Sequence, residues 1–456
     1  MEQISIGYGA IALPDEALAT PSRSHSGIVR LDIALRGSTR DFLDAPAPDP
    51  RKRADEFHAW MQARVDFGGF PYAKTLLGNP RPVSTLRLAD GREISGLNFS
   101  SQDYLNLSTH SCVTEVAIEA IRQFGLHSAG STALAGNCAL STELEIAIAE
   151  LVHTEYVSLF PTGWAAGFGA VKALIRPTDH VVIDQLAHNC LLEGAAAATR
   201  NVHIQRHLDI EHARRLLTRI RAKDCLNGIL LVTEGVFSMN SDSPDIRAMQ
   251  ALAAEYDAVL LVDVAHDLGC MGPGGTGQIG IQGMLGQVDL VMGSFSKSFA
   301  SNGGFVASNR PAVKEYLRFY ASPNTFSNAL SPVQVATILK STRIIQSSEG
   351  ETRRKALMNA IHALRTALEL RGRIVLGSPS PIVPVHVGTD AVARLACGVM
   401  AERGLITNLV EYPAVSLNTA RLRLQVMSEH SAFDCKLAAE IADASVKHAN
   451  DTVFGH

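Results

Sequence analysis

The sequence predicts an α/β protein with a mostly parallel central sheet and a smaller α+β domain at its C-terminal end. Three observations support this prediction. The chain has 456 residues, enough for more than one domain with its own core. From about residue 96 to residue 330, apolar runs alternate with helical patterns, as in a helix-covered parallel sheet. Several of these runs end in polar residues, which is typical of the carboxyl edge of such a sheet.

The N-terminal part, residues 1–95, is predicted to be an arm followed by a small β unit. Residues 1 to about 50 show no regular pattern, and the proline-rich stretch at 45–50 is typical of an extended linker. Residues 51–66 have helical periodicity. The run at 83–88 and the turn at 89–91 predict the β unit.

The remaining chain is predicted to form two further domains, a large one at 96–330 and a small one at 331–456. In the large domain we expect strands at 157–160, 180–184, 228–233, 258–263, 288–292 and 304–307, and helices at 112–124, 142–153, 210–222 and 245–256. In the small domain we expect a long helix near 332–370, strands near 382–386 and 421–426, and a final helix near 432–448.

Composition excludes several functional classes. The hydrophobic fraction of 46% and the charged fraction of 19% are ordinary for a globular protein. A net charge of −4 provides no basic surface for nucleic acid, so no nucleic-acid partner is expected. No apolar run reaches the roughly 18 residues of a membrane span, and no secretory leader is recognisable. The seven scattered cysteines have no metal-binding spacing, so we expect reduced thiols, no metal and a cytoplasmic location.

Lys297 is the strongest chemical signal in the chain. It lies in the sequence GSFSKS at 293–298, directly after the apolar run at 288–292. The preceding apolar run, LVDVAH at 261–266, ends in Asp263 and His266. This order is expected of an enzyme in which a lysine forms a Schiff base with pyridoxal 5′-phosphate (PLP) and an aspartate pairs with the pyridinium nitrogen. A solvated surface lysine is the ordinary alternative, but the apolar run before Lys297 disfavours it.

Three further motifs also follow apolar runs. PTGWAAG at 161–167 predicts a helix start that binds phosphate, although such glycine-rich starts are also common packing devices. His188 could stack on an aromatic cofactor or transfer protons, and the alternative is a loop histidine. Ser238, in TEGVFSM at 233–239, could bond a cofactor oxygen or belong to an ordinary turn.

His266 could donate to the phenolic oxygen of PLP. For Asp263 and His266 the alternative is a helix cap or a fragment of a metal site, but no further His/Glu cluster supports a metal.

Taken in order, these motifs resemble the α-oxoamine synthase family of fold-type I PLP enzymes over about residues 96–440. The resemblance implies a PLP-dependent transferase fold of the aspartate aminotransferase type. It implies that Thr162, Gly163, Trp164 and Ser294 hold the phosphate, that His188 stacks on the ring, and that Ser238, Asp263, His266 and Lys297 complete the cofactor site. The entry segment NFSSQDYL at 98–105 brings Asp103 and Tyr104 to the substrate, and Arg423 is expected to hold its carboxylate. Members are homodimers with shared active sites, so Ser327 is expected to reach the neighbour's phosphate.

The chain departs from the family pattern at five positions: Asn106, Thr132, Ser141, Val264 and Thr276. These departures place the chain outside the best-known biotin and haem branches of the family, and other segments resemble bacterial serine palmitoyltransferases more closely. The resemblance implies condensation of a small L-amino acid, serine first and alanine or glycine next, with an acyl thioester of CoA or an acyl carrier protein. Alternatives are another member of the family, such as an 8-amino-7-oxononanoate synthase or a natural-product synthase, a fold-type I aminotransferase or, least favoured, a non-catalytic partner subunit.

Overall fold

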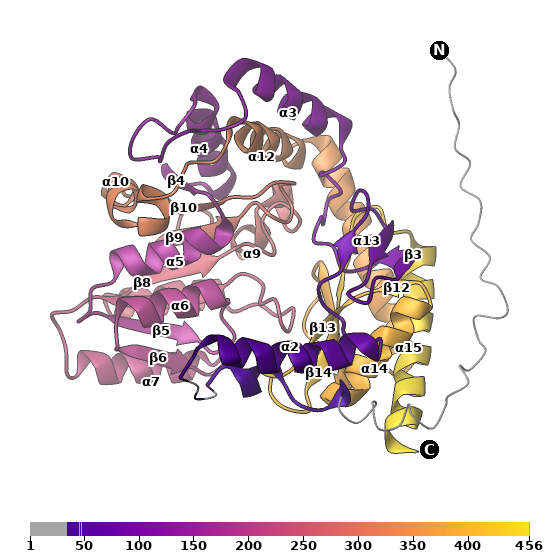
Figure 1. Ribbon diagram of the computed structural model, residues 1–456. Coiled ribbons are helices and arrows are strands. Elements are labelled where there is room, and N and C mark those ends of the chain that lie inside the picture. Colours follow the sequence, from indigo (N-terminus) through magenta and orange to yellow (C-terminus); the bar gives the residue numbers. More distant parts are fainter. Residues whose placement is uncertain (1–33, 45, 47, 456) are drawn as a thin grey trace, which may run out of the picture.

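The computed structural model describes residues 34–44, 46 and 48–455 (Figure 1). The irregular segment expected at 1–50 therefore lies partly outside the described residues. The predicted fold class is confirmed, since a mixed, mostly parallel sheet covered by helices forms the larger part of the molecule. The division into domains at 95/96 and 330/331 stays a prediction.

The central sheet has seven strands in the order β4-β10-β9-β8-β7-β5-β6. Strand β10 is antiparallel to both of its neighbours, and the remaining neighbours are parallel. In this order the strands are β4 (Tyr156–Phe160), β10 (Gly304–Ser308), β9 (Leu290–Ser294), β8 (Val259–Asp263), β7 (Ile229–Glu234), β5 (His180–Asp184) and β6 (Val202–Gln205).

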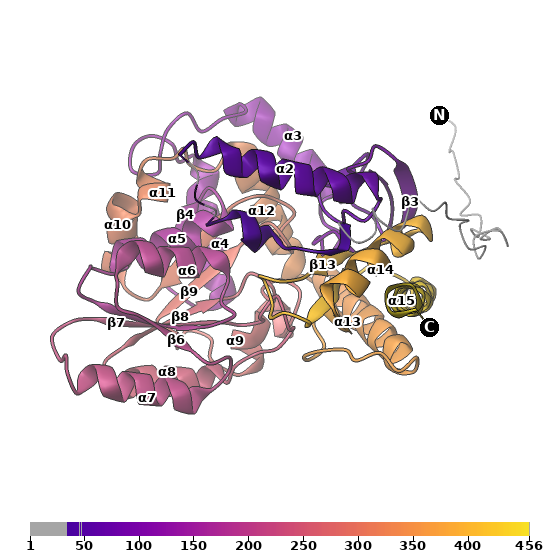
Figure 2. The same cartoon turned by 60° about the horizontal axis from the view of Figure 1, so that its bottom comes forward.

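Alternate residues of the buried strands pack into two separate hydrophobic cores, one on each face of the sheet. Leu230 and Val232 of β7 pack with α5 (Gly163–Leu174) and α6 (Asn189–Ala198). Leu231, between them, packs with residues of α7 (Ile210–Arg221) and α8 (Ile246–Glu255). Figure 2 shows these two helix layers on opposite sides of the strands. The other large-domain helices are α3 (Ser111–Phe124), α4 (Ala139–Val152), α7 (Ile210–Arg221), α8 (Ile246–Glu255), η3 (Pro273–Gly275), α9 (Gly277–Ile281), α10 (Pro311–Tyr320) and α11 (Ser322–Thr325).

The C-terminal region contains a three-stranded antiparallel sheet, β11-β14-β13, backed by helices. The single long helix expected near 332–370 was wrong: α12 ends at Ile345 and α13 begins at Ser348. Ser347 caps the new helix, and a Cβ on Gly350 would lie only 2.2 Å from the Ile345 carbonyl oxygen, so the turn is tight. The elements are α12 (Pro332–Ile345), α13 (Ser348–Glu369), β11 (Ile382–Gly388), α14 (Asp390–Glu402), β13 (Asn408–Val410), β14 (Ala420–Gln425) and α15 (Ala432–Phe454).

A third sheet joins the N-terminal β unit to the C-terminal region. Strand β3 pairs in parallel with β12, which follows α14, and the order is β1-β2-β3-β12. Arg394 of α14 also donates to the carbonyl groups of Leu35 and Gly37, so the N-terminal segment packs on the C-terminal region. These elements are η2 (Thr39–Phe42), α2 (Arg51–Asp66), β1 (Thr75–Leu76), β2 (Val83–Arg87), β3 (Glu93–Asn98) and β12 (Leu405–Ile406).

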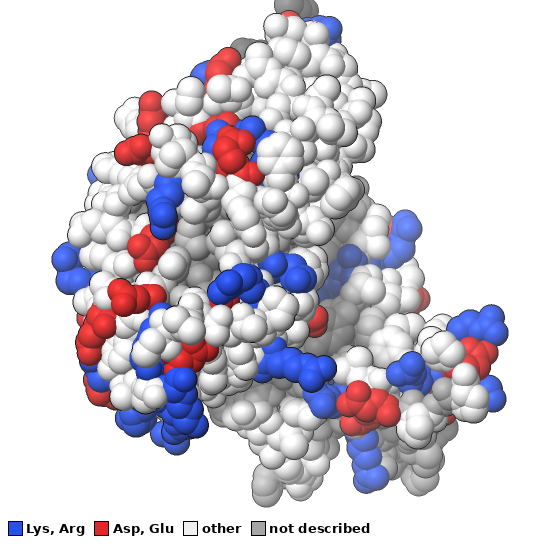
Figure 3. Space-filling view, turned by 90° about the vertical axis from the view of Figure 1, so that its left-hand side faces the viewer, with Lys and Arg blue, Asp and Glu red and all other residues white. Residues whose placement is uncertain are grey.

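Charged residues on the face of the large domain drawn in Figure 3 are of both signs and are interspersed with uncharged surface. Within the described residues, no helix is both long and apolar enough to cross a bilayer.

Candidate active site

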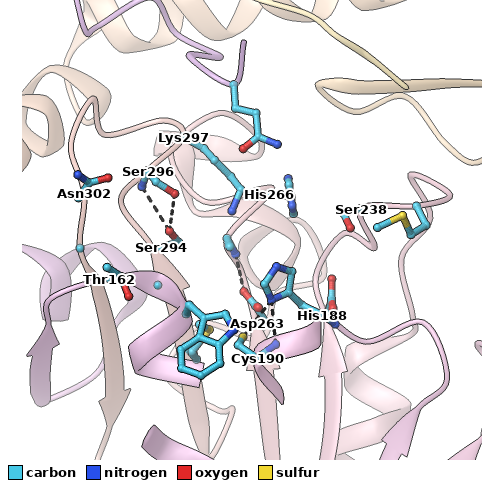
Figure 4. A pocket seen from close by; sticks show the side chains of 18 of the residues that line it. Thr162, His188, Cys190, Ser238, Asp263, His266, Ser294, Ser296, Lys297 and Asn302 are labelled. Atoms are coloured by element: carbon cyan, nitrogen blue, oxygen red, sulfur yellow. Dashed lines mark hydrogen bonds between the residues drawn. The ribbon is translucent and has the colours of Figure 1, made fainter. Parts of the chain in front are cut away.

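A cavity of about 360 Å³ lies at the carboxyl ends of the central strands, where the large domain meets β14 (Figure 4). Most of the residues predicted for the site line it, and Figure 4 shows Lys297 reaching in from one side. The predicted residues that line it are Thr162, Gly163, Trp164, His188, Ser238, Asp263, His266, Ser294, Lys297 and Arg423.

Each of these side chains is positioned by the end of a strand or the start of a helix. Asp263 is the last residue of β8, and Lys297 follows β9 in the loop that leads to β10. His188 and Thr162 are the N-cap residues of α6 and α5. Arg423 comes from β14, far along the chain, so the C-terminal region completes the cavity.

One end of the cavity is built to receive an anion. The Thr162 hydroxyl accepts from the Ala165 amide at 3.0 Å, and the first amides of α5 have no acceptor within the helix. A Cβ on Gly163 would lie 2.4 Å from Ser294 Oγ, so only glycine permits this approach of helix and strand. Ser294 Oγ and Ser296 Oγ are 2.8 Å apart. Helix amides and two hydroxyls together suit a phosphate group.

The middle of the cavity holds a buried acid and a buried amine. Burial raises the pKa of Asp263, while the charges of His188 and Lys297 act in the opposite direction. Asp263 Oδ1 accepts from the Ala265 amide at 2.8 Å. Burial lowers the pKa of Lys297, and the carboxyl groups of Asp263 and Glu234 partly oppose this shift. Lys297 is therefore more easily neutral than an ordinary lysine, and Asp263 is suited to a cationic partner.

Tyr104 contacts the His266 ring at Nδ1. The Tyr104 hydroxyl lies 2.9 Å from His266 Nδ1 and donates to Gln425 Oε1 at 3.3 Å. Burial keeps the pKa of His266 well below its usual range. Tyr104 does not line the cavity. It links β14 to the end of the strand that carries Asp263 through this pair of contacts.

Asp103 lies outside the main cavity, in a neighbouring hollow of about 340 Å³. Its carboxylate accepts from the amides of Leu107 and Ser108 at 3.0 and 3.1 Å, so it caps a turn. The hollow shares Lys297 and Gln102 with the cavity. Direct substrate contact by Asp103 and Tyr104 stays a prediction.

Ser327, expected to act on a neighbouring subunit, follows α11 and does not line the cavity of its own chain. Its role stays a prediction as well.

Arg423 is distinguished from Arg421 on the same strand by its contacts. Arg421 is engaged, since it donates to the carbonyl oxygen of Met239 at 3.2 Å and to the Asn240 side chain. Arg423 Nε, in contrast, is buried and has no hydrogen-bond partner in the part of the chain that the structure describes. Burial lowers the pKa of Arg423, and nearby Tyr104 opposes the shift. A carboxylate in the cavity would satisfy this guanidinium.

Sequence reasoning missed several lining residues. Glu234 lines the cavity and accepts a hydrogen bond from the His188 amide. Glu234 lies in the motif that led to Ser238, so its position directly after a buried strand was a usable signal. The other unassigned lining residues are Gln102, Cys190, Met239, Ala265, Met292, Ser296, Asn302 and Gly303.

The residues present fit PLP. The anion site at α5 suits its phosphate, Asp263 suits a protonated ring nitrogen, and Lys297 is a buried amine that can form the covalent link. The described part of the chain contains no group of three or more His, Cys, Asp or Glu side chains that could hold a metal ion.

Comparisons with known proteins agree with this geometry. The family model for aminotransferase class I and II matches residues 94–441. The 8-amino-7-oxononanoate synthase of Thermoanaerobacter pseudethanolicus is 31% identical over 81% of this chain and 92% of its own length. The serine palmitoyltransferase of Sphingobacterium spiritivorum is 32% identical over 79% and 90%. The 4-hydroxy-2,2'-bipyrrole-5-methanol synthase PigH of a Serratia species is 32% identical over 94% of this chain and 65% of its own.

Among solved structures, a serine palmitoyltransferase from S. paucimobilis with bound PLP–myriocin superposes with a TM-score of 0.82 at 28% identity, covering 88% of this chain and 99% of that one. The family match, the extent of the relatives and this superposition point to the same group. The chain belongs to the α-oxoamine synthase family of PLP-dependent acyltransferases.

Proposed function

We propose that this enzyme condenses a small L-amino acid, L-serine first and L-alanine or glycine next, with an acyl thioester. The products are an α-amino ketone, carbon dioxide and the free thiol. The observation that carries the proposal is the buried, unpaired Nε of Arg423 in the same cavity as the buried amine of Lys297. An amino acid offers a carboxylate to the first group and an acidic Cα proton to the second.

Bound PLP supplies an electron sink that stabilises negative charge at the amino acid's Cα. Lys297 holds the cofactor and then takes the Cα proton, a role that needs a neutral amine, which burial favours. Arg423 orients the substrate by a planar, bidentate grip on its carboxylate. Asp263 keeps the ring nitrogen protonated, and Thr162, Gly163, Trp164 and Ser294 hold the phosphate.

We further propose a homodimer in which Ser327 reaches the partner's phosphate. Exposed aromatic side chains around this segment support an interface: Phe326 is 86% exposed, Tyr320 63% and Phe319 56%. Monomeric surfaces seldom leave so many large apolar groups together. A cytoplasmic location fits the seven free cysteines.

The decisive experiment gives the PLP-loaded enzyme mixed amino acids and acyl-CoAs or acyl carrier proteins, and identifies the products by mass spectrometry. Thiol and carbon dioxide should be released in equal amounts, and only when the amino acid is present. Thiol without carbon dioxide would indicate thioester hydrolysis. A keto acid without either product would move the enzyme to the aminotransferases. Borohydride reduction and peptide mapping should place the pyridoxyl group on Lys297.

A further inference from the structure

Both hydrogen bonds that the described residues make to the His188 ring end at the same nitrogen. His188 is the N-cap of α6, and its Nδ1 accepts from the Cys190 amide at 3.3 Å. The Cys190 thiol lies 3.0 Å from the same Nδ1. Figure 4 shows the two side chains next to each other at the cavity wall, beside Asp263.

This geometry determines where the proton of the ring lies. A backbone N–H can only donate, so Nδ1 must present its lone pair. A neutral imidazole with a lone pair on Nδ1 carries its proton on Nε2. The thiol, which meets the same lone pair, must then donate its own proton. Burial, together with Asp263 and Glu234, raises the pKa of Cys190, and burial lowers the pKa of His188, so a neutral pair is also favoured electrostatically.

Neither partner has freedom to move away. The His188 amide is bound to the Glu234 carboxylate, which fixes the residue at the end of β7. The thiol is packed against α5, because a Cβ on Gly167 would lie 2.5 Å from Cys190 Sγ. The S–H group is therefore held on His188 Nδ1 by the packing of α5 against α6.

We propose that Cys190 is a positioning residue whose thiol holds His188 as the neutral, Nε2-protonated tautomer, so that His188 meets ligands as a hydrogen-bond donor and not as a base. The proposal deepens the function proposed above, and only its catalytic part rests on that function. A donor at this wall suits the anionic oxygen of a carboxylate substrate, whereas proton abstraction is left to Lys297.

The test is the long-range ¹H–¹⁵N spectrum of the histidine rings in the full-length protein, with and without PLP, with the His188 signals assigned by their loss in His188→Gln. The wild type should show the Nε2–H pattern from pH 6 to pH 9. Cys190→Ser keeps a donor and should preserve that pattern. Cys190→Ala removes the donor and should raise the pKa of His188 by roughly half a unit to one unit. The control Cys435→Ala alters a buried thiol that donates to Ala360 and should change nothing.

An Nδ1–H pattern in the wild type, or an imidazolium signal with a thiolate absorbance, would overturn the proposal even if no variant folds. If the pKa of His188 were unchanged in Cys190→Ala, the Cys190 backbone N–H alone would fix the tautomer of His188, and the proposed role of the thiol would be refuted. In turnover, Cys190→Ala should lose amino-acid affinity above the pKa of His188, where part of the neutral rings carry their proton on Nδ1, and the serine variant should follow the wild type. The spectra need no substrate. They therefore test the role of Cys190 separately from the proposed function, which is tested by release of thiol and carbon dioxide.

Discussion

At the scale of single residues, the charge on Asp263 should matter more than the neutral hydrogen bond made by His266. Asp263→Asn removes the charge opposite a protonated ring nitrogen, and hydrogen bonds to charged groups contribute about 1.5–3 kcal/mol, or roughly 10- to 100-fold in kcat/KM. His266→Asn removes a neutral bond and should cost roughly 2- to 10-fold. Steady-state kinetics of both variants checks this order. Equal losses would contradict the role given to Asp263.

Arg423 and its neighbour Arg421 provide a matched pair on one strand. Arg423→Lys should keep the cofactor spectrum but weaken amino-acid binding by on the order of 1.5–3 kcal/mol, since lysine lacks the planar fork. It should leave thermal stability nearly unchanged, because Arg423 Nε has no hydrogen-bond partner among the described residues. Arg421→Lys should instead lower stability, because Arg421 holds the Met239 carbonyl. Spectral titration with L-serine and thermal unfolding separate the two. Wild-type affinity in Arg423→Lys would refute substrate anchoring.

At the scale of elements, the loop after β7 brings Ser238 and Met239 into the cavity and is held by a half-buried histidine. His207 lies 2.9 Å from Asp184 Oδ1 and 3.0 Å from Asp242 Oδ2. Burial opposes a charge on this ring, but the hydrogen bonds and charges of the two aspartates outweigh it and raise the pKa of His207 to about 9. The loop is thus tied to the end of β5 by a cation.

This cation predicts a stability that depends on pH. The pKa of His207 is raised from roughly 6.5 in the unfolded chain, so its contribution is complete below about pH 6.5 and is lost as pH rises through about 9. The contribution is on the order of 3 kcal/mol. Urea midpoints at several pH values should show His207→Gln closest to wild type at alkaline pH. His203→Gln is the control, because burial lowers the pKa of His203. If the urea midpoints of His207→Gln and wild type changed in parallel with pH, a stabilising charge on His207 would be ruled out.

Most central strands could be predicted because β5, β7, β8, β9 and β10 are largely buried apolar runs that end in a polar residue. Asp263 and Lys297 were found in this way, because the hydrophobic pattern of a strand and the residues that follow it can be read from a short stretch of sequence. The break between α12 and α13 was missed because it depends on the close approach of Gly350 to Ile345. Cys190 was missed because its role depends on the His188 side chain turning back to cap α6. Such contacts are not encoded in local pattern.

At the scale of the whole molecule, the cavity depends on the β1-β2-β3-β12 sheet, which joins the N-terminal β unit to the C-terminal region. Leu97 of β3 donates to the Gly404 carbonyl at 2.8 Å, and Phe99 donates to the carbonyl of Ile406 at 2.9 Å. Strand β12 leads directly into β13, which pairs with β14, the strand that carries Arg423. The N-terminal β unit is therefore connected to the strand that carries Arg423 without lining the cavity.

Two glycines test this dependence. A Cβ on Gly96 would lie 2.1 Å from the Gly404 carbonyl oxygen, so Gly96→Ala must push β12 away from β3. A Cβ on Gly78 would meet nothing within 4 Å, and Gly78→Ala is the matched control. Overpacking of this kind costs about 1–3 kcal/mol, whereas an unhindered surface change stays within about 0.5 kcal/mol. Urea unfolding should therefore separate the two variants.

The site should respond to Gly96→Ala on one side only. The anion site and Lys297 belong to the central sheet, so PLP binding and its spectrum should remain. Arg423 lies on β14, which pairs with β13, and β13 follows the displaced β12 directly, so L-serine should bind more weakly. Hydrogen exchange should rise in β3, β12 and β14 and stay constant in β7, β8 and β9. Wild-type serine affinity in a destabilised Gly96→Ala would show that the β unit supports the fold but not the site. Loss of PLP together with serine would show that the two regions cannot be uncoupled.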